Sequence, residues 1–393
     1  MSHDSSRREF LTGRSALRAL ADAQEKLAVP MPAPAGEAQT WLTQISREAM
    51  ACEFEILLDA KKYPAGPDAA VEALDLVEAL EVQLTIYRDT SEVSRLNQKA
   101  FEQQVGVEER LFEIFVQARE LWQETGSAFD ITSGALTKIW GFYRRQGRMP
   151  SEAEVAEALA KVGSQHLELD ASTKSVRFLV PDLEINLGAI GKGHTLDRCA
   201  ELLGSRGIQD FVIHGGNSSV LARGVRSQGS EIRGQETEVG AATGLKSQIS
   251  NPKSSSPSPQ PPAPSPPLPW SIGLRHPLRP EQRLAEFLLQ DQALGTSGSG
   301  SQFFHHQGKR YGHILDPRTG WPAEQVLSAT VIAPTAAEAD ALSTAFYVLG
   351  IEGARAYCEQ HASISALLVT QKGAGVELQP VNLPEDNWQP CEK

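Results

Sequence analysis

The sequence predicts a mixed α/β protein of the α+β type, in which helices and strands occur without strict alternation. Segments with apolar residues at helical spacing, such as 71–84 and 111–122, are followed along the chain by short apolar runs typical of strands, such as 327–333. Of the 393 residues, 40% are hydrophobic and 22% charged, which is ordinary for a globular protein. Wholesale disorder is therefore excluded.

Charge and cysteine content exclude several classes of protein. The formal net charge is -12, from 37 basic and 49 acidic residues, which argues against general electrostatic binding of nucleic acid or anionic lipid. The four cysteines, Cys52, Cys199, Cys358 and Cys391, lie far apart without a CxxC pair, so neither a zinc site nor a disulfide framework is indicated. No apolar run approaches the roughly 18 residues of a membrane span.

Local patterns place the helices in order. The apolar residues of 71–84 and 111–122 share one helical face each. Ser151 and Glu154 form a capping-box pattern that opens a third helix running through Val162. A fourth helix is expected over 195–203, after a glycine-rich turn. Thr335 and Glu338 predict a further capped helix, which Gly350 ends.

Strands are expected at short apolar runs between these helices. They are 184–187, 212–213, 270–274, 284–289, 327–333 and 363–369. Residues 227–269 carry almost no large apolar side chains, and within 251–269 fourteen of nineteen residues are Pro or Ser. Such a stretch predicts a disordered segment. Because strands flank it, we expect an insertion within one domain rather than a linker between two.

The predicted organisation is therefore a leader and linker over 1–45, one domain over 46–372 interrupted by the insert at 227–269, and a C-terminal tail over 373–393. Residues 6–11 (SRREFL) resemble a twin-arginine export signal, but charged residues from Arg14 to Lys26 interrupt the apolar segment that such a signal needs. Two locations stay open at this point. The interrupted segment slightly favours the cytoplasm, and the arginine pair favours export.

The turn at Gly188–Gly193 is the first candidate for chemistry. Between a strand and a helix, its backbone N–H groups are free to meet an anion, and Lys192 adds a positive charge suited to phosphate. The segment is neither a Walker A motif nor a full GxGxxG fingerprint. On the residues alone, a phosphate site and a structural turn are equally good interpretations.

The second candidate lies at the start of the helix that Thr335 caps. Asp340 and Thr344 are four residues apart and share one helical face, where a carboxylate and a hydroxyl form a small oxygen site suited to Mg²⁺. The alternative is that Asp340 is only a favourable charge in the first turns of a helix. The residues by themselves favour this alternative.

Two further segments remain open between structural and functional interpretations. His313 lies near Asp-Pro and Thr-Gly turn signals, as an acid–base group or as a structural histidine. The segment Gly126–Leu136, with Phe129 and Asp130, suits either a planar heterocycle or a core loop. The pair His305 and His306 is given no role.

Taken in order, these segments resemble the FAD:protein FMN transferase (ApbE) family. The matching segments are Met50-Ala51-Cys52, 87–97, 128–132, 140–142, 188–193, 215–217, 296–298, 313–317 and 340–344. The resemblance spans about residues 46 to 372 and implies a flavin transferase fold that forms one catalytic unit. It also implies an enzyme that uses FAD as substrate with Mg²⁺. Such an enzyme moves FMN onto a threonine or serine of a target protein and releases AMP.

The resemblance also implies the residues of the site. The FAD site is expected to be lined by Met50, Tyr87, Ala128, Phe129, Asp130, Asn186, Lys192 and Ile314. The metal is expected to be held by the backbone carbonyl of Ala189 with Asp340 and Thr344, and Ser343 is a weaker candidate because some relatives have aspartate there. His313 is the expected proton acceptor from the attacking hydroxyl, with Asp130 as the alternative that contacts the flavin or assists the base.

Some features depart from the family pattern. Asn186 stands where aspartate is usual, and Ala51 and Cys52 replace a glycine and a threonine. The lipoprotein signal of exported relatives is missing, and the long Pro/Ser insert is unusual. Two alternatives stay open. The resemblance also implies a metal-dependent FAD pyrophosphatase, because some relatives hydrolyse FAD, and the departures at Asn186, Ala51 and Cys52 support a flavin-binding module without activity. The expected partner is otherwise an acceptor protein with redox function.

Overall fold

The computed structural model describes residues 40–226, 230–232, 268–298, 300 and 302–391. The predicted leader up to residue 39 and residues 233–267 of the predicted insert lie outside the described residues. The two locations weighed from the N-terminus therefore stay predictions. No helix in the described ranges is both long and apolar enough to cross a membrane.

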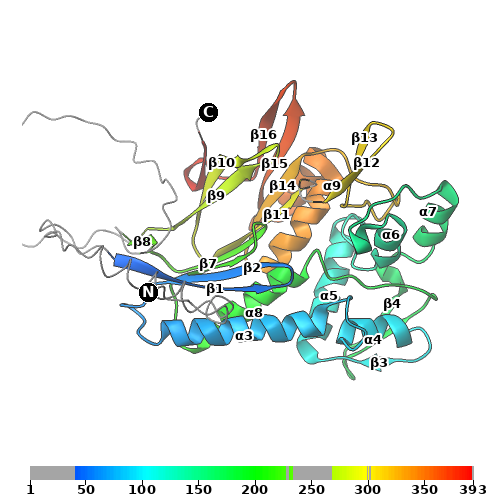
Figure 1. Cartoon of the computed structure of the whole chain (residues 1–393), viewed down its shortest axis with the longest axis horizontal. Helices are drawn as coiled ribbons and strands as arrows, with labels where there is room; N and C mark the ends of the chain where they lie inside the picture. Colours follow the sequence, from blue (N-terminus) through cyan, green and yellow to red (C-terminus); the bar gives the residue numbers. More distant parts are fainter. Residues whose placement is uncertain (1–39, 227–229, 233–267, 299, 301, 392–393) are drawn as a thin grey trace, which may run out of the picture. The chain divides into compact units, whose positions relative to one another are not determined.

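A nine-stranded sheet organises the fold (Figure 1). Its strand order is β16-β15-β14-β11-β7-β6-β2-β1-β8, and every neighbouring pair is antiparallel except β1 with β8. The strands are β1 (Thr40–Ala49), β2 (Cys52–Leu58), β6 (Phe211–Gly215), β7 (Ser219–Arg223), β8 (Ser230–Ile232), β11 (Gln292–Gly298), β14 (Ser328–Ala333), β15 (Ser365–Lys372) and β16 (Gly375–Val381).

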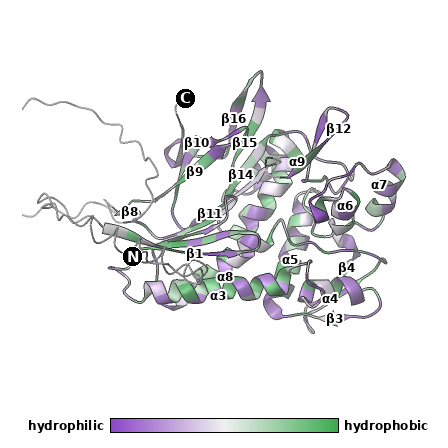
Figure 2. Cartoon of the chain, in the orientation of Figure 1, coloured by the Kyte–Doolittle hydropathy of each residue, from purple (hydrophilic) through white to green (hydrophobic). Residues whose placement is uncertain are grey.

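The two faces of this sheet are covered differently. Side chains alternate along each strand, and on one face Phe54, Ile213 and Val331 pack in the same core as three helices. These are α3 (Gly66–Leu84), α8 (Gly191–Ser205) and α9 (Ala336–Gln360). On the other face, Val212 and Ile332 pack against a three-stranded sheet of β9 (Trp270–His276), β10 (Arg279–Leu289) and β17 (Trp388–Pro390). Figure 2 shows hydrophobic residues along α3 and the central strands.

The remaining elements form a second group beside α8 and α9 (Figure 1). They are α4 (Glu92–Lys99), β3 (Val105–Gly106), α5 (Glu109–Glu124), α6 (Gly134–Ile139), η1 (Phe142–Arg144), α7 (Glu152–Leu159), η2 (Ser164–His166), β4 (Leu167–Asp170), β5 (Ser175–Phe178), and the hairpin of β12 (Phe303–His306) and β13 (Lys309–Gly312). A last 3-10 turn, η3 (Glu385–Asn387), precedes β17. Buried Trp140 packs with α6, α7 and the β12–β13 hairpin in a separate small cluster, and its indole donates a 2.8 Å hydrogen bond to the carbonyl of Gly320.

Most elements predicted from the sequence are confirmed. Segments 71–84 and 111–122 lie within α3 and α5, and the Ser151–Glu154 capping box forms with both of its hydrogen bonds. The expected strands from 212–213 onward correspond to β6, β9, β10, β14 and β15. The four-residue strand at 184–187 is wrong, because Glu184 makes only an isolated bridge with Ser133.

Two helix boundaries also differ from the prediction. The helix expected from 195 begins at Gly191, so two glycines of the predicted turn are helical. The helix expected to run through Val162 ends at Leu159. At Gly350 the backbone is non-helical, with a φ of 70°, so the helix that Thr335 caps is interrupted there as predicted, and a second helical segment of α9 continues to Gln360.

The domain extends beyond the expected boundaries at both ends. Strand β1 begins at Thr40, within the segment taken as leader and linker. Residues 373–393 were expected to form a tail, but β16 pairs with β15 and β17 pairs with β10, so ordered pairing continues to Pro390. At the insert, Arg226 and Leu268 form an antiparallel bridge with hydrogen bonds of 2.9 and 3.1 Å. This is the geometry expected of an insertion within one domain.

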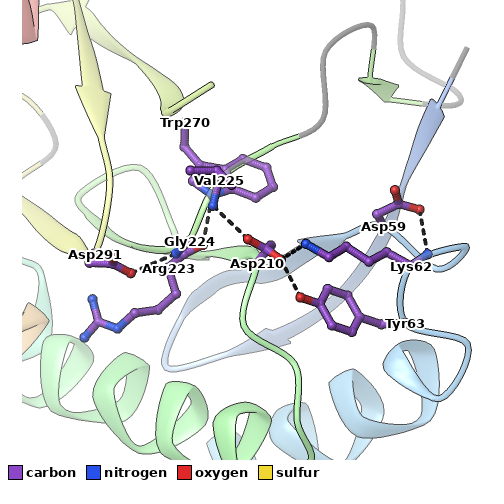
Figure 3. Close-up of polar contacts among 9 residues, drawn as sticks. All are labelled: Asp59, Lys62, Tyr63, Asp210, Arg223, Gly224, Val225, Trp270 and Asp291. Atoms are coloured by element: carbon purple, nitrogen blue, oxygen red, sulfur yellow. Dashed lines mark hydrogen bonds and ion pairs between the residues drawn. The ribbon is translucent and has the colours of Figure 1, made fainter. Parts of the chain in front are cut away.

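The base of the insert is fixed by Asp210 (Figure 3). One carboxylate oxygen accepts hydrogen bonds from the Lys62 ammonium and the Tyr63 hydroxyl, and the other accepts from the backbone N–H of Val225 at 2.9 Å. Nearby, the Trp270 indole donates to the carbonyl of Arg223 at 3.0 Å. The chain therefore leaves and re-enters the domain at positions that side chains hold in place.

Candidate functional site

The site is built where α8, α9 and β11 approach one another closely. A Cβ at Gly193 would collide with the backbone of Ala336, and a Cβ at Gly295 would collide with the carbonyl of Ala339. Glycine at both positions therefore allows backbone contact between these elements. As a result the N–H of Gly193 donates a 2.7 Å hydrogen bond to a carboxylate oxygen of Asp340.

Asp340 is buried and incompletely neutralised. Its second carboxylate oxygen accepts a 2.7 Å hydrogen bond from the Ser219 hydroxyl. Burial raises the pKa of Asp340, and the charge of Lys192 with the bonds from Ser219 and Gly193 only partly opposes this. The Lys192 ammonium itself donates to the hydroxyl of Ser218. The site thus combines a buried carboxylate with a nearby lysine that is bonded elsewhere.

Three hydroxyls lie beside the backbone of Asp340. The Ser297 hydroxyl is 2.8 Å from that of Ser343 and 3.0 Å from that of Thr344. The Ser343 hydroxyl also donates to the carbonyl of Asp340 at 2.8 Å. The sequence prediction that Asp340, Ser343 and Thr344 lie together therefore agrees with the structure, while their role as metal ligands stays a prediction.

The donor set fits a hard cation. It contains one carboxylate and hydroxyl oxygens, and in the described ranges no three His, Cys, Asp or Glu side chains are close enough to hold a metal ion. Mg²⁺ is commonly held by one or two carboxylates together with substrate phosphate and water. A buried carboxylate whose pKa is raised also gains from a cation. Ala189, the expected carbonyl ligand, lies in the turn just before α8.

Asn186 organises the turn that leads into α8. Its side-chain oxygen accepts a 2.9 Å hydrogen bond from the N–H of Gly188, and its own N–H donates to the carbonyl of Ile131 at 2.7 Å. Both bonds need only an oxygen acceptor and a backbone donor, so an amide serves as well as a carboxylate. The departure from the family pattern therefore leaves this turn intact.

Asp130 is engaged within the protein. One oxygen accepts from the Thr132 N–H, the Thr132 hydroxyl and the Ser164 hydroxyl at 2.7–2.9 Å, and the other accepts from the Ser164 N–H at 3.1 Å. Burial raises the pKa of Asp130 against these bonds. These contacts give it a structural role in ordering the loop. Contacts of Asp130 and of buried Ala128 and Phe129 with FAD stay predictions.

His313 is held in an orientation suited to a base. Its backbone N–H and its ring Nδ1 lie 3.2 and 3.1 Å from the carbonyl oxygen of Gln302. Because a carbonyl only accepts, Nδ1 carries the proton and Nε2 keeps its lone pair. Burial lowers the pKa of His313, the Gln302 carbonyl opposes this and the charge of Lys192 adds to it. The ring is therefore neutral at neutral pH and lies within electrostatic reach of Lys192.

The remaining predicted residues lie in three other segments of the chain. Tyr87 is 65% exposed, and its ring centroid lies 4.9 Å from that of Tyr143. Met50 lies in the β1–β2 turn, with its sulfur 3.8 Å from the hydroxyl of Thr195 on α8. Ile314 follows His313 and is buried in the main core. Their contacts with FAD stay predictions.

Sequence reasoning missed the serines that complete the cluster. Ser297 lies in the matching segment 296–298, to which no role was given, and Ser218 and Ser219 follow the matching segment 215–217. Cys52 was considered only as a departure from the family pattern. Burial raises the pKa of its thiol, the charge of Lys192 opposes this rise and the charge of Asp340 adds to it. Serines are too common for spacing to reveal them before the strands are paired.

A separate cavity of about 680 Å³ lies between α5, α8 and the start of α9. None of the predicted site residues lines it. Asp197 on its wall accepts hydrogen bonds from the N–H groups of Ala336 and Ala337 at 2.8 and 2.9 Å, which fixes the start of α9 against α8. This cavity therefore borders the framework of the site and is not the site itself.

The fold and this cluster define a mixed α/β protein with a buried carboxylate, a lysine and hydroxyls gathered between two helices. Residues 50–368 match the model of the ApbE family, and the chain belongs to that family. This confirms the resemblance and the fold class inferred from the sequence.

Named relatives agree with this assignment. The chain is 28% identical over 314 residues to the FAD:protein FMN transferase of Klebsiella pneumoniae (strain 342), covering 79% of this chain and 85% of that protein. The protein of that name from Escherichia coli (strain K12) is 26% identical, covering 87% and 88%. The solved apo form of the flavinyl transferase ApbE of Pseudomonas stutzeri is 25% identical with a TM-score of 0.69, covering 86% and 94%.

Proposed function

We propose that this protein is a FAD:protein FMN transferase, which moves FMN from FAD to a serine or threonine hydroxyl of an acceptor protein. The observation that carries the proposal is the position of Lys192 beside buried Asp340 in a chain of the ApbE family. Asp340 accepts hydrogen bonds from Gly193, which follows Lys192, and from Ser219, which follows the Ser218 that Lys192 binds. The relatives named above bear this activity in their names.

The reaction is a group transfer at phosphorus. The acceptor oxygen forms a bond to the phosphorus of the FMN half, the bond from that phosphorus to the AMP oxygen breaks, and AMP leaves. The hydroxyl proton passes to Nε2 of His313, which the Gln302 carbonyl holds in the required tautomer. Lys192 supplies positive charge beside the diphosphate, where negative charge is concentrated.

Asp340, Ser343 and Thr344, with the carbonyl of Ala189, are the residues that would hold Mg²⁺. When bound, the cation would neutralise charge on the diphosphate oxygens. Gly193 and Ser219 orient the Asp340 carboxylate for this purpose, since each bonds a different oxygen. Burial of the carboxylate excludes water that would compete for it.

The acceptor follows from the product. A covalently attached flavin serves oxidation and reduction, so we propose a redox protein as acceptor. Hydrolysis of FAD, with water in place of the acceptor hydroxyl, uses the same site and is an outcome of the test below. The alternative of a flavin-binding module without activity rested on Asn186, Ala51 and Cys52, and the turn made by Asn186 is intact.

The test is incubation of the purified chain with FAD, Mg²⁺ and threonine-containing acceptor proteins. We expect the acceptor mass to increase by one FMN, with one AMP released for each FMN attached. Release of AMP and free FMN with no acceptor modified would support the hydrolase instead. Bound FAD with no AMP released under any condition would overturn the enzymatic proposal.

A further inference from the structure

We propose that Ser218 is a positioning residue of the transferase site, and that its hydroxyl holds the Lys192 ammonium apart from the Asp340 carboxylate. Without this hydroxyl the two charged side chains would form an internal ion pair, and the carboxylate would be closed to a cation. This role rests on the proposed function, in which Lys192 faces the diphosphate and Asp340 holds Mg²⁺.

Two serine hydroxyls stand between the lysine and the aspartate. The Lys192 ammonium donates to the Ser218 hydroxyl, whose oxygen lies 3.4 Å from that of Ser219. The Ser219 hydroxyl in turn donates to a carboxylate oxygen of Asp340 at 2.7 Å. An ammonium group can only donate and an ionised carboxylate can only accept, so Ser218 is left to donate to Ser219. Within the described ranges, no direct ion pair joins Lys192 to Asp340.

The turn that carries Ser218 is held from two sides. It joins β6 to β7, and the N–H of Thr296 on the neighbouring strand β11 donates a 2.7 Å hydrogen bond to the Ser218 carbonyl. On the other side, a Cβ at Gly216 would come within 2.9 Å of the Cβ of Cys52, so the turn packs closely on the start of β2. The backbone of Ser218 is therefore fixed, and with it the region that its hydroxyl can reach.

Lys192, in contrast, reaches the site on a flexible side chain from the first turn of α8. Its ammonium is a point charge on a four-carbon stem, so its position depends on the acceptors that it finds. Its charge affects the pKa of Cys52, His313 and Asp340. Burial raises the pKa of the thiol and lowers that of the imidazole, which leaves both neutral at neutral pH. Of these three groups, Asp340 is therefore the partner that the ammonium would take without Ser218.

The base of the insert shows what a direct pair of this kind does in the same protein. There the Lys62 ammonium donates to the Asp210 carboxylate with no hydroxyl between them (Figure 3). Burial raises the pKa of that carboxyl, but the contact with Lys62 and the other bonds outweigh it, and the pKa is lowered. A carboxylate in contact with a lysine has its charge largely neutralised, so it attracts a further cation less strongly.

The serine spacer leaves both charged groups able to bind a ligand. An ammonium has three donors, and Lys192 uses one of them on Ser218. Each carboxylate oxygen of Asp340 accepts one hydrogen bond, from Gly193 or from Ser219, and keeps a further lone pair. Ligands that first had to separate an ion pair would bind more weakly, because part of their binding free energy would be used to open the site.

The test measures the binding of Mn²⁺, a paramagnetic substitute for Mg²⁺, to the full chain without FAD, by electron paramagnetic resonance of the free ion. Asp340→Asn identifies the binding that belongs to the site. The wild type is compared with Ser218→Ala, with Ser218→Thr, which keeps the hydroxyl, and with the control Ser205→Ala, which removes a hydroxyl at the far end of α8. Ser218→Ala is also combined with Lys192→Met, because a double-mutant cycle shows whether the serine acts through the lysine. FMN transfer is measured against Mg²⁺ concentration for the Ser218 variants.

We expect Ser218→Ala to raise the Kd for Mn²⁺ about tenfold, because the lysine then competes with the ion for the carboxylate. The Mg²⁺ concentration that gives half of the maximal transfer rate should rise by a similar factor, while excess Mg²⁺ restores most of that rate. Ser218→Thr and Ser205→Ala should bind Mn²⁺ within about twofold of the wild type. In the Lys192→Met background, Ser218→Ala should change the Kd by less than about twofold, because no ammonium remains to pair with Asp340.

Three outcomes would contradict this role. An unchanged Kd in Ser218→Ala, with FMN still transferred, would overturn the inference and leave the transferase intact. An equal loss of affinity with and without Lys192 would also overturn it, since Ser218 would then act on its turn and not through the lysine. Equal Mn²⁺ binding by the wild type and Asp340→Asn would instead count against the metal site of the proposed function, and the role of Ser218 would fall with it.

Discussion

Two buried aspartates in different regions of the domain accept similar hydrogen bonds, but their pKa values are shifted in opposite directions. Asp210, at the base of the insert, and Asp340, at the site, each accept one backbone N–H and one hydroxyl (Figure 3 for Asp210). Burial pushes the pKa of Asp210 up, but Lys62, Tyr63 and Val225 outweigh it and the pKa is lowered. Burial dominates at Asp340, and its pKa is raised.

The difference is the position of the lysine. Lys62 donates directly to Asp210, whereas Lys192 donates to Ser218 and reaches Asp340 only through space. A carboxylate that the protein has neutralised stabilises the fold, and one that it leaves short of positive charge is available to a ligand. The comparison thus separates an aspartate that a lysine neutralises directly from one that the protein leaves short of positive charge.

The backbone shows the same contrast. Near Asp210 the left-handed conformation is taken by a glycine, Gly224, with a φ of 59°. At the site side, the two-residue turn between β1 and β2 is formed by Met50 and Ala51, with φ of 50° and 59°. Positive φ at both central residues of a two-residue hairpin loop is typical of a type I′ turn, in which the sequence Asn-Gly is favoured. Positive φ is therefore taken by two non-glycine residues in the turn beside the site and by a glycine next to Asp210, although Asp291, which accepts a hydrogen bond from Gly224, also has a φ of 52°.

Replacing Asp340 should give the largest effect. Asp340→Asn removes the charge that, in the proposed function, would hold the cation, and we expect kcat for FMN transfer to fall by about 10³-fold, because metal stabilisation of the transition state is worth several kcal/mol. The Ser219 hydroxyl can turn to accept from the new amide, so the fold should not lose stability. Transfer assays and thermal unfolding of the same preparation measure both.

The effect of Asp340→Asn on the free energy of unfolding also tests the comparison between Asp340 and Asp210. A carboxyl whose pKa is raised on folding stabilises the protein below its unfolded pKa, and this contribution is lost as pH rises through the folded pKa. At neutral pH Asp340→Asn should therefore unfold at the wild-type temperature or above. A variant with full transfer activity, or one that unfolds well below the wild type, would place Asp340 in the structural class.

Replacing His313 should have the second-largest effect on transfer activity. His313→Gln keeps a side-chain amide able to bond the Gln302 carbonyl but removes the base, and kcat should fall about 10²-fold. In the wild type the acid limb of kcat against pH should lie below the ordinary histidine value of about 6.5, because burial lowers the pKa of His313. The variant should lose that limb, and a limb that persists would assign the proton transfer to another group.

Replacing Asp210 should have the third-largest effect, and it should change stability alone. In Asp210→Asn an amide nitrogen faces either the Val225 N–H or the Lys62 and Tyr63 donors, so one set of bonds is lost. We expect the free energy of unfolding to fall by about 2 kcal/mol, with transfer activity at low temperature unchanged. Chemical denaturation measures the first and the transfer assay the second. A loss of activity in a folded variant would show that Asp210 also contributes to activity, and the distinction between the two aspartates would fail.

The fold was predictable where a pattern is local. The capping residues Ser151 and Thr335 and the apolar faces of α3 and α5 determine their helices through neighbours a few residues away. The strand expected at 184–187 failed because apolar alternation gives no partner, and the chain there meets only Ser133. The strands after 372 were missed because each depends on a partner elsewhere in the chain, β16 on β15 and the three-residue β17 on β10.

The site was predictable as a set of residues but not as a geometry. Asp340 and Thr344 follow from helical spacing, and Lys192 from its turn. The serines Ser218 and Ser219 and the distant Ser297 come from two different parts of the chain, and only the pairing of β7 with β11 brings them together. Likewise, the Ser164 hydroxyl donates a hydrogen bond to the Asp130 carboxylate, which the sequence analysis had considered as a contact of the flavin.

The smallest effect concerns the strained turn. Ala51→Gly places at φ 59° a residue that adopts this conformation freely, whereas the left-handed region costs other residues roughly 1–2 kcal/mol. Glycine also gains freedom in the unfolded chain, by about 0.4–1 kcal/mol. The exposed Ala51 methyl contributes little packing. We therefore expect a net gain of about 0.5–1 kcal/mol in the free energy of unfolding, measured by chemical denaturation.

The matched control is Gly224→Ala, the reverse change at nearly the same φ. Its new Cβ would collide with the Asp210 carboxylate in addition to the conformational cost, so it should destabilise the protein by at least about 2 kcal/mol. Opposite signs at the two positions would establish that the strain at Met50-Ala51 is real and relieved by glycine. If Ala51→Gly instead lowers stability, the turn is held by contacts that outweigh its backbone conformation, and the contrast between the two regions rests on their aspartates alone.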